Sequence, residues 1–109
     1  MPQTSMTRTI TSAALEARSE PILTDEFMSK LPSWAGGNIS PHDCRFLTGL
    51  VSHFRPRNVL EIGVASGWSS AVLLHTLKAI HGDDPHRLNA IDLFENYYLK
   101  PEYKTGVLV

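Results

Sequence analysis

The stretch NVLEIGVASGWSSAVLLHTLKAIHG, residues 58–82, decides the fold of this chain. Its first part, residues 58–64, gathers aliphatic and β-branched residues in a short run, which predicts a central parallel strand buried on both faces. From Trp68 to about Ile80, apolar residues recur at helical spacing, and Gly82 is a typical terminator. The stretch therefore predicts a strand, a glycine-containing turn and a helix.

Two further elements flank this stretch. The run RLNAIDLF, residues 87–94, follows a polar turn and predicts a second short strand that leads into Asp92. Upstream, Ser40 suits an N-cap and Pro41 the first helical position, so we expect a helix with one apolar stripe that ends before Pro56. Strand, helix and strand form a βαβ unit, in which the strands lie side by side and parallel.

The rest of the chain predicts only short elements. Helices are expected over residues 13–18 and 24–31, ahead of a loop rich in Pro and Gly at 32–38. A parallel sheet normally has several strands with helices on both faces, whereas two strands are predicted here. We therefore expect an incomplete Rossmann-like α/β fold. Residues 1–37 would form an N-terminal arm with short helices, and residues 38–109 the truncated front part of a larger domain.

Composition narrows the classes of partner. The chain is 42% hydrophobic and 19% charged, as in ordinary globular proteins, and its formal net charge of -1 gives no general attraction to nucleic acid or anionic membranes. Cys44 is the single cysteine, which suits a reducing compartment. No apolar run approaches the roughly 18 residues of a membrane span. We expect a soluble cytoplasmic protein with a small-molecule substrate and with neither a nucleic-acid nor a membrane partner.

The turn EIGVASGWSS, residues 61–70, stands where a βαβ unit binds cofactors, outside the carboxyl end of its first strand. Gly63 and Gly67 would let a ligand approach the backbone, and the following helix would present its positive end. A dinucleotide fingerprint that begins at Gly63 would need glycine in place of Ala65 and Trp68, and an indole prevents the close packing that the third glycine allows. A P-loop is excluded because no Gly-Lys-Ser/Thr follows. A different nucleoside cofactor is therefore expected.

The pattern E-x-G-x-A-x-G at residues 61–67 resembles the first motif of class I S-adenosylmethionine-dependent methyltransferases. The segment VLEIGVASGWSS is especially similar to the corresponding segment of small-molecule O-methyltransferases of the catechol and caffeoyl-coenzyme A type. The second element of that family is an acid that closes the second strand, and Asp92 stands in that position. The resemblance covers residues 38 to about 95. It implies S-adenosyl-L-methionine as the cofactor and methyl transfer to a small-molecule acceptor, on oxygen.

The resemblance also implies roles for individual residues. The backbone of Gly63 would lie against the methionine part of the cofactor, Glu61 would help to hold the methionine amino group, and Ser69 would bond the carboxylate. Asp92 would accept hydrogen bonds from both ribose hydroxyls, and the loop 38–40 would close on the carboxylate. The expected cofactor-binding positions are Ile39, Glu61, Gly63, Ala65, Gly67, Ser69 and Asp92.

Two other functions stay open at this point. One is an NAD(P)-binding oxidoreductase on the same kind of sheet, which Ala65 and Trp68 disfavour. The other is a catalytically silent fragment that acts through a second copy or a completing chain, because two strands leave an open sheet edge. Each expected site residue also has a purely structural alternative, as part of a tight turn, a helix cap or a solvated acid at a strand end.

The remaining candidate residues predict no further chemistry. The five histidines show no i, i+4 pair and no Cys/His spacing that would indicate a metal site. Cys44 has no activating base nearby in the sequence and is expected to be a buried, inert thiol. The cluster of Tyr97, Tyr98 and Tyr103 is more typical of packing than of a substrate pocket. The sequence therefore predicts a donor site and no metal ligand, and it leaves the catalytic residues unidentified.

Overall fold

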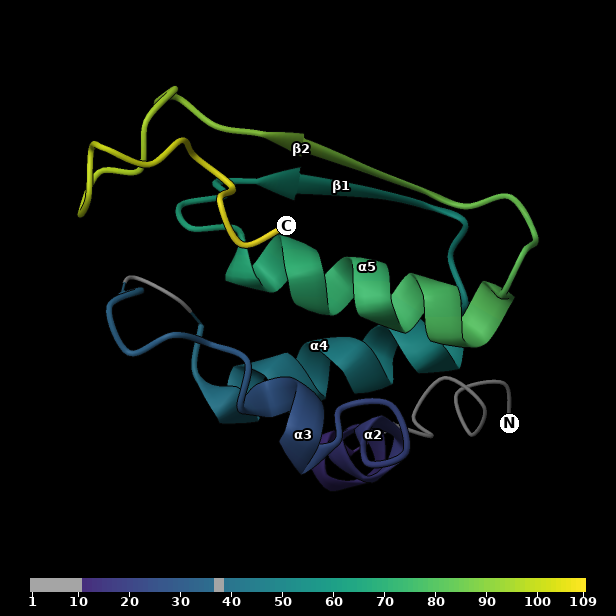
Figure 1. The fold of residues 1–109 in the computed structure, drawn as a ribbon. Coiled ribbons are helices and arrows are strands. Elements are labelled where there is room, and N and C mark those ends of the chain that lie inside the picture. Colours follow the sequence, from purple (N-terminus) through teal and green to yellow (C-terminus); the bar gives the residue numbers. More distant parts are fainter. Residues whose placement is uncertain (1–10, 37–38) are drawn as a thin grey trace, which may run out of the picture.

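The computed structural model describes residues 11–36 and 39–109. In these ranges the chain forms an α/β fold with the sheet on one side and the helices on the other. Figure 1 shows the two strands above α5, α4 beneath α5, and the two shorter helices beneath α4. The elements are α2 (Ser12–Ser19), α3 (Asp25–Met28), α4 (Pro41–Phe54), β1 (Asn58–Ile62), α5 (Trp68–His81) and β2 (Arg87–Ile91).

The sheet confirms the predicted βαβ unit. β1 and β2 pair in parallel, with Asn58 opposite Arg87 and Ile62 opposite Ile91. The pairing continues one residue beyond β1, where the Gly63 N–H donates to the Ile91 carbonyl at 2.8 Å. Both strands therefore end at the same edge of the sheet, and the two turns that follow them lie next to each other.

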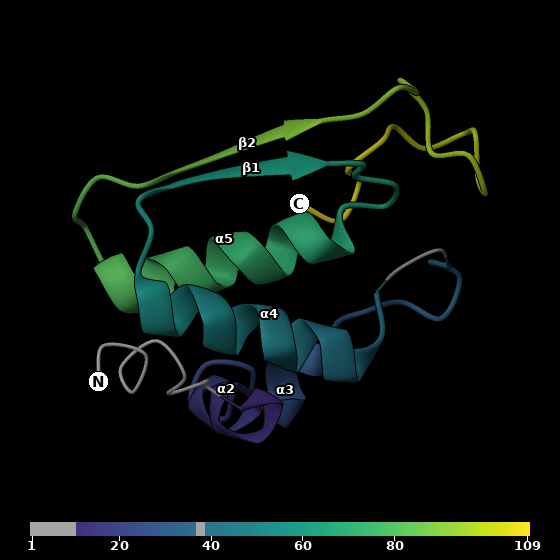
Figure 2. The same cartoon turned by 180° about the vertical axis from the view of Figure 1, so that it is seen from behind.

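The prediction that β1 is buried on both faces is wrong. Val59 packs with the apolar cluster between the sheet and the helices, but Leu60 and Ile62 are 63% and 76% exposed. Figure 2 shows the reason: α4 and α5 lie on one face of the sheet, and no described element covers the other. Burial alternates along the strand, but aliphatic residues stand on both of its faces. The sequence therefore shows no alternation of apolar and polar residues that would have predicted the exposed face.

The core is built around α5. Trp68 and Val72, near its start, pack against Leu23 and Cys44. Leu23 precedes α3, so the N-terminal helices belong to the same packed body as α5. The boundary expected between residues 37 and 38 lies outside the described residues. A second cluster lies under the sheet and contains Val51, Leu73 and Leu77.

The ends of α4 agree with the prediction. The Ser40 hydroxyl accepts from the Asp43 N–H at 3.1 Å and caps the helix, and Pro41 takes the first helical position. Arg55 closes the helix in a left-handed conformation, φ 52°, directly before Pro56. Inside the helix, the buried Cys44 is confirmed, and its burial raises the pKa of the thiol.

The second of the short N-terminal helices, α3, ends earlier than expected. Thr24 caps it as predicted, by accepting from the Phe27 N–H at 3.2 Å. The helix stops at Met28 instead of Leu31. Leu31 is followed by Pro32, and a residue before a proline is disfavoured in the helical conformation. The helix α2 is longer by one residue at each end than the range 13–18. Among the residues that the structure describes, no helix combines the length and apolar character needed to cross a lipid bilayer.

Candidate functional site

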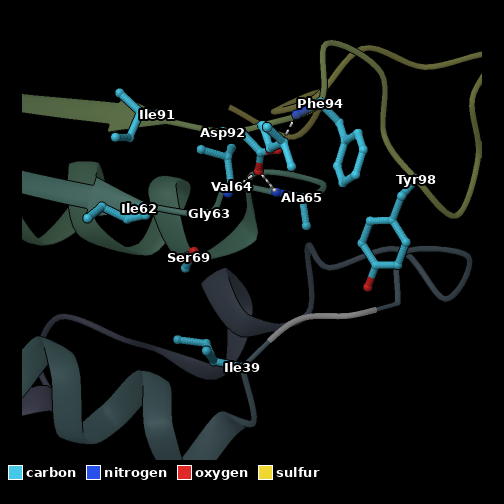
Figure 3. A pocket seen from close by; sticks show the side chains of 11 residues that line it. Ile39, Ile62, Gly63, Val64, Ala65, Ser69, Ile91, Asp92, Phe94 and Tyr98 are labelled. Carbon is cyan, nitrogen blue, oxygen red and sulfur yellow. Dashed lines mark hydrogen bonds between the residues drawn. The ribbon is translucent and has the colours of Figure 1, made fainter.

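A cavity of about 690 Å³ lies at the carboxyl ends of the two strands. Its size is in the range of roughly 300–1,000 Å³ that is common for small-molecule sites. Three parts of the chain form its walls: the turn after β1, the segment after β2 and the loop ahead of α4 (Figure 3). Five of the seven positions expected from the sequence line it, namely Ile39, Gly63, Ala65, Ser69 and Asp92.

The two glycines of the turn after β1 have different environments. Both have left-handed backbone, with φ 87° at Gly63 and φ 95° at Gly67. A methyl group added to Gly63 would meet no atom within 4 Å, so this backbone is open to a ligand. The same group on Gly67 would lie 2.8 Å from the Gly106 Cα. Gly67 therefore admits the C-terminal segment and lies outside the cavity lining.

The C-terminal segment braces this turn. The Gly106 N–H donates to the Ala65 carbonyl, and the Leu108 N–H donates to the Ser66 carbonyl, both at 2.8 Å. Leu108 also packs against the core cluster around Trp68. These contacts hold Ala65, which has φ 51°, in the left-handed conformation that costs a non-glycine residue energy.

Substituting Gly63 by alanine is expected to weaken binding of a ligand in the cavity with a modest loss of stability. The left-handed conformation costs alanine about 1–2 kcal/mol. Gly82→Ala is the matched control, because Gly82 also has positive φ, 60°, and open space around it, but lies at the far end of α5. Denaturant unfolding should show a loss of stability for both variants, whereas only Gly63→Ala should weaken ligand binding. Equal binding by both would contradict a ligand at Gly63.

Asp92 joins the segment after β2 to the turn after β1. Its Oδ2 accepts from the N–H groups of Val64 at 2.6 Å and Ala65 at 3.2 Å, and its Oδ1 accepts from the Phe94 N–H at 2.8 Å (Figure 3). These hydrogen bonds lower the pKa of Asp92, and the bond from the Phe94 N–H has the largest effect. The Asp92 carboxyl group is therefore ionised at neutral pH. A carboxylate has about four acceptor positions. The three existing hydrogen bonds leave one acceptor position of Asp92 for a ligand. The resemblance, in contrast, implies that Asp92 accepts hydrogen bonds from two ribose hydroxyls.

The stability of the chain is expected to depend on the ionisation of Asp92. Its pKa is lowered on folding from the ordinary value of 3.8, so its contribution is complete above that value. As the pH falls below about 3.8 and through the folded-state pKa, the contribution is lost. Thermal midpoints of the wild type and Asp92→Asn should therefore converge at acid pH. A constant difference between them from pH 6 to the acid limit would contradict this role.

Glu61 and Ser69 lie together, beside the cavity. The two oxygens of the Glu61 carboxylate accept hydrogen bonds from the hydroxyls of Ser69, at 2.5 Å, and of Ser70. Ser70 was not among the predicted residues, although its position beside Ser69 in the first turn of α5 was a usable signal. Gly67, at the amino end of α5, has no side chain that could cap the helix. Because the Ser69 hydroxyl already donates to Glu61, the positive end of this helix is what remains at Ser69 to favour a ligand carboxylate.

The charge of the cavity wall limits what can bind. Asp92 is the one charged side chain among the described residues that line it, and no Lys or Arg does so. The remaining wall is mostly aliphatic or aromatic. Such a cavity suits a neutral or positively charged ligand with hydroxyl groups, because an anion would lack a cationic side chain as a partner.

Phe94 and Tyr98 are wall residues that the sequence did not reveal. Both rings lie along the side of the cavity formed by the segment after β2 (Figure 3). The three tyrosines of this segment serve different purposes: Tyr98 lines the cavity, Tyr97 is fully buried, and Tyr103 stacks on Trp34. The packing expected for all three holds for Tyr97 and Tyr103. The nearness of Phe94 to Asp92 in the sequence was the available signal.

The other sequence expectations concern metals and the loop ahead of α4. Within residues 11–36 and 39–109, no group of three or more His, Cys, Asp or Glu side chains could hold a metal ion. Ile39 lines the cavity from this loop, as expected. Asn38 lies outside the described residues.

The site thus combines an open glycine backbone, an ionised carboxylate and largely apolar walls at the carboxyl ends of two parallel strands. This is the location at which open α/β sheets bind nucleotide cofactors. Comparison of the chain with protein-family models, with curated proteins and with solved structures finds no match.

Proposed function

We propose that this chain binds S-adenosyl-L-methionine and serves as the cofactor-binding part of a Rossmann-like methyltransferase domain that acts on a small-molecule acceptor. The observation that carries the proposal is the position of Asp92 beside the open backbone of Gly63, in a cavity whose described lining residues include no basic side chain. The sequence resemblance at residues 61–67 and at Asp92 supports the same cofactor.

The charges around the cavity favour a sulfonium cofactor over a dinucleotide. S-adenosylmethionine has positive charges on its sulfonium and amino groups, and in this cavity it would meet Asp92 in the wall and Glu61 beside the wall. The pyrophosphate of NAD(P) is negative and would meet no Lys or Arg among the described lining residues. Trp68 also argues against a dinucleotide, since its side chain, 4% exposed, fills the place of the third glycine.

Each part of the cofactor has a matching element in the cavity. The free acceptor position of Asp92 suits a ribose hydroxyl, and the open backbone at Gly63 suits the methionine part. The amino end of α5 favours the methionine carboxylate. Phe94 offers an aromatic surface for the base.

When bound, the cofactor supplies an activated methyl group for in-line displacement by an acceptor atom. The residues of this chain would contribute by placement: Asp92 and the turn after β1 hold the nucleoside, and Ile39 limits access from the opposite wall. Correct placement of donor and acceptor is a large part of such catalysis, with the reacting atoms roughly 3–3.5 Å apart.

The proposal is tested by thermal unfolding in the presence of three compounds that all contain adenosine. S-adenosylhomocysteine at about 100 times its Kd should stabilise the chain by about 2.7 kcal/mol, whereas adenosine should act weakly and NADH not at all. Protection by NADH and not by S-adenosylhomocysteine would favour the oxidoreductase. Protection by none of them would favour a function without this cofactor.

A second candidate function is completion of the sheet by another chain. β1 is paired on one edge only within the described residues, and a groove of about 550 Å³ runs along β1 and the exposed Phe54 and Leu60. An added strand could pair with the open edge and cover this apolar surface. Light scattering of the purified chain tests this candidate, because a stable monomer at high concentration would contradict self-completion.

A further inference from the structure

The hydroxyl of Tyr97 connects two parts of the chain that are 61 residues apart. It donates a hydrogen bond to the Gly36 carbonyl at 2.6 Å and accepts one from the Gly36 N–H at 2.8 Å. The Tyr97 side chain is fully buried, with 0% exposure. One phenol therefore satisfies both polar groups of the Gly36 backbone.

Aromatic packing reinforces this connection. Trp34 stacks on Tyr103, with ring centroids 4.9 Å apart, and lies tilted against Tyr97 at 6.4 Å. The Tyr97 N–H donates to the Tyr103 carbonyl at 2.9 Å, which closes the 97–103 segment on itself. The Gly36 backbone is therefore fixed to a folded segment, and we call this set of contacts the Tyr97 clasp.

The Tyr97 clasp lies between two walls of the cavity. On one side, Tyr98 follows Tyr97 directly in the chain and lines the cavity; the two rings meet edge to face at 5.6 Å. On the other side, Gly36 is three residues before Ile39, so the chain limits the distance between their Cα atoms to about 11 Å. Figure 3 shows Ile39 and Tyr98 on different sides of the cavity.

We propose that Tyr97 is a positioning residue, which sets the spacing between the Ile39 wall and the Tyr98 wall and so adjusts the cavity to its ligand. This inference rests on the proposed function, because it assumes that the cofactor occupies this cavity. A rigid Tyr97 clasp would spare the ligand the cost of ordering the cavity walls when it binds. Loss of the hydroxyl would transfer that cost to binding.

The direct test is titration of S-adenosylhomocysteine into Tyr97→Phe. This substitution keeps the buried ring and removes both hydrogen bonds to Gly36, so affinity should fall about fivefold, in line with the loss of one or two hydrogen bonds. Tyr103→Phe is the matched control: it removes a hydroxyl from the same segment while the ring can remain on Trp34, and it should bind like the wild type. All titrations are made at a temperature at which circular dichroism shows each variant to be fully folded.

A double-mutant cycle separates positioning from general stability. If Tyr97 acts through the Ile39 wall, Ile39→Ala should weaken binding less in the Tyr97→Phe background than in the wild type. Additive effects, or unchanged affinity in a folded Tyr97→Phe chain, would overturn the inference while leaving the proposed cofactor in place. Absence of binding by the folded wild type would instead overturn the proposed function on which the inference rests.

Discussion

Asp92→Ala is expected to weaken binding of S-adenosylhomocysteine roughly tenfold or more. Two effects act in the same direction. The substitution removes the free acceptor position that suits a ribose hydroxyl, and it releases the N–H groups of Val64 and Ala65, which Asp92 holds at 2.6 and 3.2 Å. Both the ligand contact and the shape of the turn would change. Calorimetric titration of the two proteins measures the loss.

Two other variants show which effect dominates. Asp83→Ala removes an exposed acid that pairs with Lys78 at the opposite end of α5, and it should leave affinity unchanged. Asp92→Asn keeps one oxygen that can accept from the turn while it removes the charge. Affinity near that of the wild type in Asp92→Asn would assign the effect to the turn, and full affinity in Asp92→Ala would exclude Asp92 from the site.

Trp68→Ala is expected to lower the free energy of unfolding by about 3–5 kcal/mol, the usual cost of emptying an aromatic core position. Trp68 is 4% exposed and packs in the cluster of Leu23, Cys44 and Val72. Its indole also stacks on Phe27, with centroids 5.4 Å apart. The substitution would therefore loosen the start of α5, where the turn after β1 joins the core. Urea unfolding followed by circular dichroism measures the change.

The second tryptophan is the matched control for this experiment. Trp34 is 36% exposed and stacks on Tyr103 at the surface. Trp34→Ala should cost at most about 1.5 kcal/mol, because an exposed aromatic pair contributes little beyond its contact area. Similar losses in both variants would show that the cluster around Trp68 does not anchor the core.

The strands and the two long helices were predictable because their signals are local. Ser40 and Pro41 mark the start of α4, and Gly82, with φ 60°, caps the end of α5. The burial of β1 was not predictable in the same way. Leu60 and Ile62 look like core residues, yet they face outward because no described helix covers that side of the sheet. Burial depends on what packs against a strand, and residues within the strand do not record it.

The candidate site shows the same limit. Gly63 was predicted from its place in the turn after the first strand, and Asp92 from the family resemblance. The parallel strands bring both residues to one edge of the sheet, where they meet. The separate purpose of Gly67 depends on the approach of Gly106, which is far away in the sequence. The contact between Tyr97 and Gly36 spans 61 residues and has no sequence pattern. Contacts of this kind appear only when the chain is folded.

The central claim is binding of S-adenosylmethionine by this chain, and calorimetric titration of the folded wild type tests it most directly. S-adenosylmethionine and S-adenosylhomocysteine should each bind saturably with one site per chain, whereas NADH under the same conditions should give no binding heat. Absence of binding by either sulfur nucleoside, with a chain shown to be folded by circular dichroism, would contradict the claim and would leave completion by another chain as the better account.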